Sequence, residues 1–303
     1  MSYDLWLLPK DGRELSRKEF RAFFKERQWY TLEDGQATYM NEDTGVYFVF
    51  DYRKKPEDED EQDELPYPHV FFNLNFFRPH TFGLEAEIEL TAFARHFGLT
   101  VSDPQTEGMG DGEYSSEGFL RGWNSGNAFA YCSILSQDEP GDTWYSLPGA
   151  VLEGYWRWSL HREEFYENLK LDLFVPTINY FLMNGKVVSA VVWGDAIPIA
   201  LPRVDYVILV TQDLAKRDGR ALRKGKPVLS LVEWDMVAHL VSGYPLKSSP
   251  VEHRLLFYDP SPKEIVDFFL SQPAFDKSLI SAMPADQILT AELVKEAREM
   301  TLR

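Results

Sequence analysis

The first 103 residues alternate short apolar segments with turn residues, and this spacing limits the folds that the chain can adopt. Each apolar segment has five to eight residues, the length of a β-strand, and two other stretches follow the helical period. The strand-like segments are SYDLWLL at 2–8, QATYM at 36–40, GVYFVFDY at 45–52, VFFNLNFF at 70–77 and LTVSD at 99–103. Their order, with the helices between them, predicts a small α/β unit with a mostly antiparallel sheet.

The two helices of this region have recognisable ends. Ser16, with Glu19 three residues later, forms a capping box ahead of phenylalanines that share one helical face. Residues 83–98, GLEAEIELTAFARHFG, place apolar side chains at the helical period and end at Gly98, a typical C-terminal cap.

A change of composition follows at 104–117, PQTEGMGDGEYSSE, which is rich in glycine, serine and acidic residues. Such a segment is typical of a flexible linker. We therefore expect a domain boundary here, with a first domain at 1–110 and a second domain at 111–303.

The second half predicts further helices and strands. We expect helices at 118–124 and 161–169, and a central β-meander at 171–211 in which Asn184-Gly185 is a strong hairpin signal.

Two more helices are expected near the C-terminus. Ser261 and Pro262, with Glu264 as the capping-box carboxylate, predict the start of one helix, and an amphipathic helix follows from Thr290. Together these patterns predict an α+β protein with two mostly antiparallel sheets and helices packed on them.

Acidic residues dominate the charge of the chain and gather in one short segment. The 303 residues include 31 Lys and Arg against 48 Asp and Glu, which gives a net charge of −17 at pH 7. Seven of these carboxylates lie in EDEDEQDE at 57–64, where mutual repulsion predicts a solvated loop tip. The acidity disfavours direct binding of nucleic acid and suits a basic protein partner.

One segment departs from this trend. Between Arg203 and Lys226, seven Lys or Arg residues stand against three Asp residues. We interpret this segment as an exposed loop that balances charge within the molecule, although it could also bind an acidic patch.

The sequence indicates a reducing compartment. The single cysteine, Cys132, excludes an internal disulfide bond. The N-terminus lacks the basic start and long apolar run of a signal peptide, and no uncharged apolar stretch approaches the roughly 18 residues that span a bilayer. We therefore expect a cytoplasmic protein that does not bind membranes.

No complete catalytic or cofactor-binding motif occurs in the sequence. GMGDG at 108–112 lacks the lysine and the hydroxyl of a phosphate-binding loop, GxSxG is absent, and the six histidines do not have the spacing of metal ligands. Glu85 and Glu89 could form an acid/base pair, but the wet side of a helix is the simpler interpretation. We therefore expect no catalytic residue, no metal site and no cofactor.

Aromatic residues cluster in the chain before the segment at 104–117 and again after it. Most aromatic residues of such a chain belong to the core. Trp123, Tyr155 and Trp156 are nevertheless candidates for contact with a partner, because an exposed aromatic ring is a common anchor of an interface.

Four segments carry a resemblance to a known group of proteins: MSYDLWLLP at 1–9, YMNEDTGVYFVFDY at 39–52, FNLNFFRPHTFGLEAEIELTAFARHFGLTVSDPQ at 72–105 and FVPTINYFLMNGKVVSAVVWGDAIPIALPRVDYVIL at 174–209. Together they resemble the cytosolic immunity proteins encoded beside bacterial polymorphic toxins, including those of type VI secretion systems. The resemblance implies a bacterial protein that binds a cognate toxin and neutralises it stoichiometrically, without chemistry of its own.

The negative net charge of the chain is complementary to a basic toxin, such as a nuclease. We therefore predict that the partner contacts the acidic segment and the exposed aromatic residues. These predicted partner-binding residues are Glu57, Asp58, Glu59, Asp60, Glu61, Asp63, Glu64, Trp123, Tyr155 and Trp156.

Two other functions stay open at this point. The chain could be an enzyme with an unrecognised hydrolytic site built from carboxylates, which would need a deep polar pocket with converging acidic or histidine side chains. It could also be a scaffold that gives no protection against a toxin.

Overall fold

The computed structural model describes residues 1–10, 13, 15–54, 69–105, 107–137, 143–214 and 226–301. They fold as a mixture of helices and sheets, which confirms the predicted α+β class. Two compact units are present, unit 1 comprising Met1–Gly149 with Ala285–Arg303 and unit 2 comprising Ala150–Pro284. The boundary predicted at residue 110 therefore falls inside unit 1 and not between the units.

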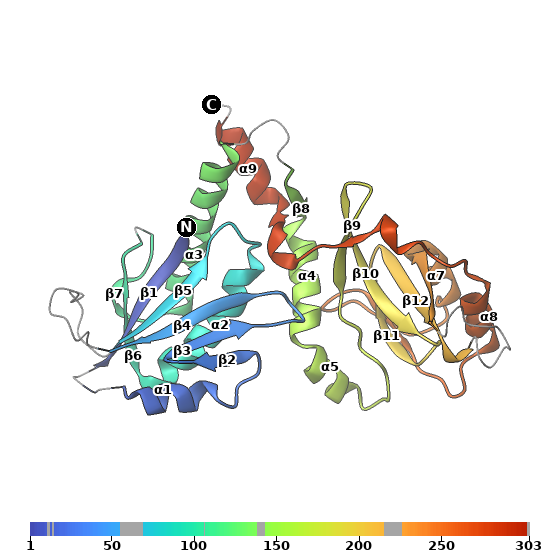
Figure 1. The fold of residues 1–303 in the computed structure, drawn as a ribbon, viewed down its shortest axis with the longest axis horizontal. Helices are drawn as coiled ribbons and strands as arrows, with labels where there is room; N and C mark the ends of the chain where they lie inside the picture. Colours follow the sequence, from blue (N-terminus) through green and yellow to red (C-terminus); the bar gives the residue numbers. More distant parts are fainter. Residues whose placement is uncertain are drawn as a thin grey trace. The chain divides into compact units, whose positions relative to one another are not determined.

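A seven-stranded antiparallel sheet forms the centre of unit 1 (Figure 1). Its strands follow the order β2-β3-β4-β5-β1-β6-β7, so the first strand of the chain lies near the middle. The strands are β1 (Ser2–Pro9), β2 (Tyr30–Glu33), β3 (Gln36–Met40), β4 (Tyr47–Arg53), β5 (His69–Asn75), β6 (Leu99–Asp103) and β7 (Gly110–Glu113). All five strand-like segments of the first 103 residues are thus strands of this sheet.

Helices α1 (Arg17–Phe24), α2 (Thr81–Phe97) and α3 (Ser116–Leu135) pack on the sheet. Alternate residues of the central strands, such as Leu5 of β1 and Phe72 of β5, join these helices in one core. Since successive side chains of a strand point to opposite faces, every second residue of these strands lies on the face that the helices cover.

The predicted helix ends of unit 1 are confirmed. The Ser16 side chain accepts a hydrogen bond from the Glu19 main chain, and the Glu19 carboxylate accepts one from the Ser16 main chain, which completes the capping box. Helix α2 ends at Gly98, whose φ of 62° is left-handed.

The C-terminal segment belongs to unit 1. Strand β17 (Ile288–Thr290) pairs in parallel with β8 (Tyr145–Leu147), and the predicted tail helix is α9 (Ala291–Thr301). Helix α9 packs on α3, where Val294 and Ala297 join Tyr131 in a small core. These contacts explain why residues 111–149 group with the first unit.

Unit 2 contains a five-stranded sheet of order β13-β12-β10-β9-β16 and a three-stranded sheet of order β11-β15-β14. Its strands are β9 (Asn179–Met183), β10 (Lys186–Gly194), β11 (Ile199–Pro202), β12 (Tyr206–Thr211), β13 (Val228–Glu233), β14 (Leu246–Lys247), β15 (His253–Leu256) and β16 (Ser281–Ala282). Its helices are α4 (Gly149–Leu160), α5 (Arg162–Leu169), α7 (Trp234–Leu240) and α8 (Lys263–Ser271).

The hairpin predicted at Asn184-Gly185 joins β9 to β10, and both turn residues have positive φ. The predicted meander over 171–211 is wrong beyond this hairpin, because β11 leaves the sheet to pair with β15, and β12 then returns parallel to β10. Pro202 ends β11 and Pro198 precedes it. Since proline donates no main-chain hydrogen bond, this segment is a poor central strand.

The helix predicted after Ser261 also begins differently. Pro262 is the N-cap of α8, and no side chain caps the helix there. The Ser261 hydroxyl instead donates to the main-chain oxygen of Ala196 at 2.9 Å. A tertiary hydrogen bond has therefore replaced the expected capping box.

Candidate functional site

The acidic segment at 57–64, with the predicted partner-binding residues Glu57 to Glu64, lies outside the described residues. Part of the basic segment between Arg203 and Lys226 lies outside them as well. The structure therefore places only the three aromatic candidates.

Trp123 is a core residue and not a surface anchor, which corrects its prediction as a contact residue. Its side chain is 0 % exposed and stacks on Phe76, with 5.3 Å between the ring centroids. Gly83 of α2 leaves the space that the indole fills, because a Cβ atom at Gly83 would lie 2.0 Å from the Trp123 ring. Trp123 therefore fixes the packing of α3 on α2.

Tyr155 and Trp156 lie on α4 and belong to unit 2. The Tyr155 hydroxyl lies 3.1 Å from the Ser189 hydroxyl, and burial raises the pKa of Tyr155. Trp156 is 8 % exposed, so its ring offers little surface to a partner. Neither residue has the exposed ring that the prediction requires.

Glu85 and Glu89 face inward from α2 and do not form the wet side of the helix. Glu85 accepts hydrogen bonds from the Tyr39 hydroxyl at 2.7 Å and the Asn41 amide at 2.8 Å. Glu89 accepts a bidentate pair of bonds from Nε and Nη2 of the Arg27 guanidinium. Both carboxylates therefore tie α2 to neighbouring segments, a structural role that the sequence reasoning did not anticipate.

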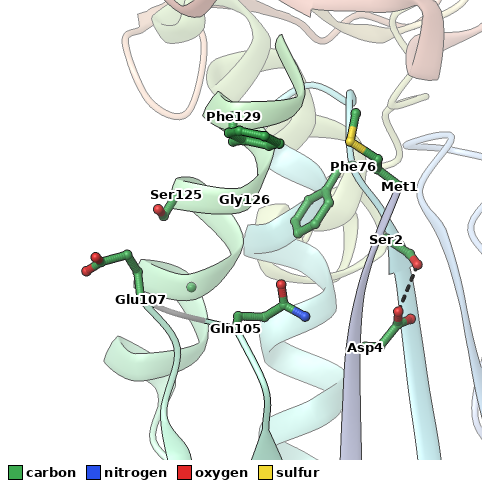
Figure 2. Close-up of a pocket in the computed structure, with 10 residues that line it drawn as sticks. Met1, Ser2, Asp4, Phe76, Gln105, Glu107, Ser125, Gly126 and Phe129 are labelled. Atoms are coloured by element: carbon green, nitrogen blue, oxygen red, sulfur yellow. Dashed lines mark hydrogen bonds between the residues drawn. The ribbon is translucent and has the colours of Figure 1, made fainter. Parts of the chain in front are cut away.

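An open groove of about 640 Å³ lies in unit 1 between the start of β1 and helix α3 (Figure 2). Phe76 lines it between the two elements, and Gln105 and Glu107 border it from the loop after β6. Its lining residues are Met1, Ser2, Asp4, Phe76, Gln105, Glu107, Gly122, Ser125, Gly126 and Phe129.

The groove exists because the pairing of β6 with β1 stops early. Their register pairs Trp6 with Ser102, and its continuation would place Pro104 opposite Asp4. Proline has no N–H group to donate to Asp4, so the ladder cannot continue through that position. The chain leaves β1 at this point, and the first residues of β1 have β5 as their strand neighbour on the other side.

Apart from Phe129, helix α3 borders the groove with residues that have little or no side chain. A Cβ atom at Gly122 would lie 2.2 Å from the Tyr3 hydroxyl, and one at Gly126 would lie 2.2 Å from the Phe76 ring. Glycine is therefore required for α3 to approach the sheet this closely, and Ser125 adds only a short side chain (Figure 2).

The loop that closes one end of the groove is held by a buried carboxylate. Asp103 accepts hydrogen bonds from the Tyr3 hydroxyl at 2.6 Å and from the main-chain N–H groups of Gln105 and Met109. Burial, followed by the bond to Asp103, raises the pKa of Tyr3 above its usual range. The segment predicted as a linker is thus anchored to the sheet, and its end forms the edge strand β7.

The chemistry of the groove combines an exposed aromatic ring with carboxylates. Phe129 is 67 % exposed, the largest exposed fraction among the large apolar side chains of the described residues. Glu107 adds a carboxylate, and no lysine or arginine is among the lining residues. Asp4 borders the groove through the start of β1, but its side chain alternates with the buried Tyr3 and Leu5 and accepts hydrogen bonds from Asn73 and Ser2 on the other face of the sheet. The Arg121 guanidinium, which lies nearby, donates to the main-chain oxygens of Glu107 and Gly108. A cationic side chain with an apolar stem fits this combination of ring and carboxylates.

Sequence reasoning missed Phe129, Asp4 and Glu107 as candidate site residues. Two signals in the sequence could have indicated this groove. One is Pro104, which directly follows a predicted strand, and the other is the spacing of Gly118, Gly122 and Gly126 along one helical face.

Unit 2 has a smaller groove of about 350 Å³ beside α5. It mixes Arg162 with Glu163 and Glu167, so its charges are of both signs. In the described part of the chain, no group of three or more His, Cys, Asp or Glu residues is placed to hold a metal ion. None of the described helices combines the length and apolar character needed to cross a membrane.

Comparisons of the chain with protein-family models, with curated proteins and with solved structures return no match.

Proposed function

We propose that this protein is an immunity protein that binds a basic toxin, such as a nuclease, and neutralises it in a stoichiometric complex. The observation that carries the proposal is the open groove of unit 1, which combines the exposed ring of Phe129 with the carboxylate of Glu107 and is bordered by Asp4 at the start of β1. An exposed aromatic anchor with charged groups at its rim is a feature of protein interfaces.

The net charge supports a basic partner. At −17, the chain attracts a cationic protein over a distance, which raises the association rate. A nuclease must neutralise phosphate groups and therefore carries positive charge around its active site. An acidic protein that covers this charge also blocks access of the nucleic acid.

The shape of the groove favours binding over catalysis. A hydrolytic enzyme of the carboxylate type needs acidic side chains that converge in an enclosed pocket. Asp4 and Glu107 instead line an open groove, and the Asp4 carboxylate accepts a hydrogen bond from the Ser2 hydroxyl at 3.0 Å (Figure 2). The resemblance of four segments to immunity proteins supports the same function.

Co-expression with the toxin encoded by the neighbouring gene tests the proposal. We expect cells that produce both proteins to survive, and the two proteins to co-purify as a complex. Phe129→Ala combined with Glu107→Lys should weaken this protection. The matched control combines Phe257→Ala, which truncates an exposed phenylalanine of unit 2, with Glu26→Lys, which reverses an exposed charge outside the groove.

Survival that does not depend on this protein, or a toxin that it does not bind, would refute the function. Protection that persists in full with the groove variant would leave the function in place and remove the groove as its site.

A further inference from the structure

Main-chain groups of β1 face the groove without a strand partner among the described residues. The N–H of Phe76 donates to the main-chain oxygen of Met1 at 3.0 Å, and the same register pairs Tyr3 with Leu74. In an antiparallel pair, alternate residues direct both main-chain groups to the same neighbour. The main-chain groups of Met1 and Tyr3 therefore point to β5. Those of Ser2 and Asp4 point to the opposite side, where the groove lies.

On that side, β6 pairs with β1 only from Trp6 onwards. The β1–β6 ladder stops where Pro104 would lie opposite Asp4. Among the residues that the structure describes, no main-chain hydrogen bond links Ser2 or Asp4 to a partner on this side. An open strand edge of this kind is a template for another strand.

The groove gives such a strand room. It borders Ser2 and Asp4 on one side and Gly122, Ser125 and Gly126 on the other (Figure 2). Between Gly122 and Gly126 the wall of α3 has only short side chains, and Phe129 lies beyond them. Three residues of an added strand would cover about 10 Å along β1.

We propose that the edge of β1 at Ser2 and Asp4 receives an extended segment of the basic partner as an added strand. The inference rests on the proposed function for the nature of the partner. Main-chain hydrogen bonds to Ser2 and Asp4 fix the segment, as in other cases of strand addition. Successive side chains of an added strand alternate between the two faces of the sheet. Lys or Arg side chains on the α3 side meet the Glu107 carboxylate and the ring of Phe129, and those on the other side lie near the Asp4 carboxylate.

Charge complementarity selects this occupant over a second copy of the chain. The edge strand of another copy would bring its own Asp4 and Glu107 into the groove, and like charges would then repel each other. A basic segment instead pairs each carboxylate with a cation.

Peptide binding to the full chain tests the inference. The probe is acetyl-Val-Lys-Val-Lys-Val-amide, and the readout is nuclear magnetic resonance of the ¹⁵N-labelled protein. We expect the peptide to shift the amide signals of Ser2, Asp4 and Gly126 and to slow the hydrogen exchange of the Asp4 amide. A peptide with alternate main-chain nitrogens methylated should bind at least about tenfold more weakly, since it cannot complete the ladder. The Val-Glu-Val-Glu-Val peptide should not shift these signals.

A pair of variants on α3 adds a steric control. Ser125→Trp fills the groove from an exposed position that lines it, and Asn124→Trp places the same ring on an exposed neighbour that does not line it. We expect Ser125→Trp to abolish peptide binding and Asn124→Trp to preserve it, with both variants melting as the parent protein does.

Three outcomes would overturn the inference: equal binding of the methylated peptide, signal shifts at another site, or sedimentation that shows a dimer joined through this edge. If the toxin is neutralised but Ser125→Trp protects as well as the parent protein, strand addition is wrong and the function stands. If the peptide binds as described but no toxin is neutralised, the edge is a peptide site and the immunity function is wrong.

Discussion

At the scale of the residue, single side chains decide where backbone structure begins and ends. Pro104 ends the ladder between β6 and β1. Asp103, one position earlier, accepts two hydrogen bonds from the loop that follows and a third from Tyr3 of β1. The sequence showed both residues, but the composition around them indicated a linker. A local window cannot reveal that a carboxylate is buried and that the next residues fold onto it.

His253 makes the stability of unit 2 depend on pH. The imidazole is 1 % exposed, its Nδ1 lies 2.8 Å from the main-chain oxygen of Val251, and its ring packs between Trp158 and Phe165. Burial, with a smaller contribution from the charge of Lys247, lowers the pKa of His253 below its ordinary value of 6.5. The folded protein therefore binds this proton less readily than the unfolded chain does.

The free energy of unfolding should be unaffected by this group above pH 6.5 and should fall as the pH drops below 6.5, because the unfolded chain then gains the proton first. Urea unfolding between pH 7 and pH 5 measures the effect. His253→Phe should remove part of the decrease, whereas His239→Gln, at an exposed position of α7, should leave it intact. An identical pH dependence in all three proteins would contradict the assignment.

At the scale of the element, local signals predicted helices and hairpins well and strand neighbours poorly. The capping box at Ser16, the left-handed Gly98 and the turn at Asn184-Gly185 each depend on a few adjacent residues. Strand β11 pairs with β15, which is distant in the sequence, and not with the strands of the predicted meander. The groove likewise required the register of β1 with β6, which local windows do not contain.

Helix α3 gives a direct test of close packing. Alanine at Gly126 would favour the isolated helix by up to about 1 kcal/mol, but its Cβ atom would lie 2.2 Å from the Phe76 ring. Phe76 is mostly buried and stacked on Trp123, so moving it should cost about 1–3 kcal/mol. We therefore expect Gly126→Ala to lower the free energy of unfolding, and Ser125→Ala, at an exposed position, to change it little. A stabilised Gly126→Ala protein would show that α3 does not approach the sheet as described.

At the scale of the whole molecule, the charge is distributed unevenly along the chain. Seven of the acidic residues lie within 57–64, and the groove of unit 1 adds the carboxylates of Asp4 and Glu107. The sequence predicted a basic partner from this charge and placed the contact on the acidic segment and on three aromatic residues, of which the structure buries Trp123 and Trp156 and leaves Tyr155 partly exposed. An exposed ring, Phe129, was missed because exposure depends on tertiary packing.

Replacing the seven acidic residues of 57–64 with Ser or Asn should slow association with the toxin, chiefly at low salt. Long-range attraction acts before contact and is screened by ions, so the difference between this variant and the parent protein should shrink as salt increases. Stopped-flow association at several salt concentrations measures both rates. A rate that is indifferent to the substitutions and to salt would rule out this segment as the steering element.

The central claim is that one molecule of this protein neutralises one molecule of toxin. Titration of a fixed amount of purified toxin, with its residual activity as the readout, tests this most directly. We expect the activity to fall linearly and to vanish at an equimolar ratio, since the complex is tight and the inhibitor is not regenerated. Complete loss of activity at a small fraction of an equivalent would indicate an enzyme, and full activity in excess of this protein would contradict the account.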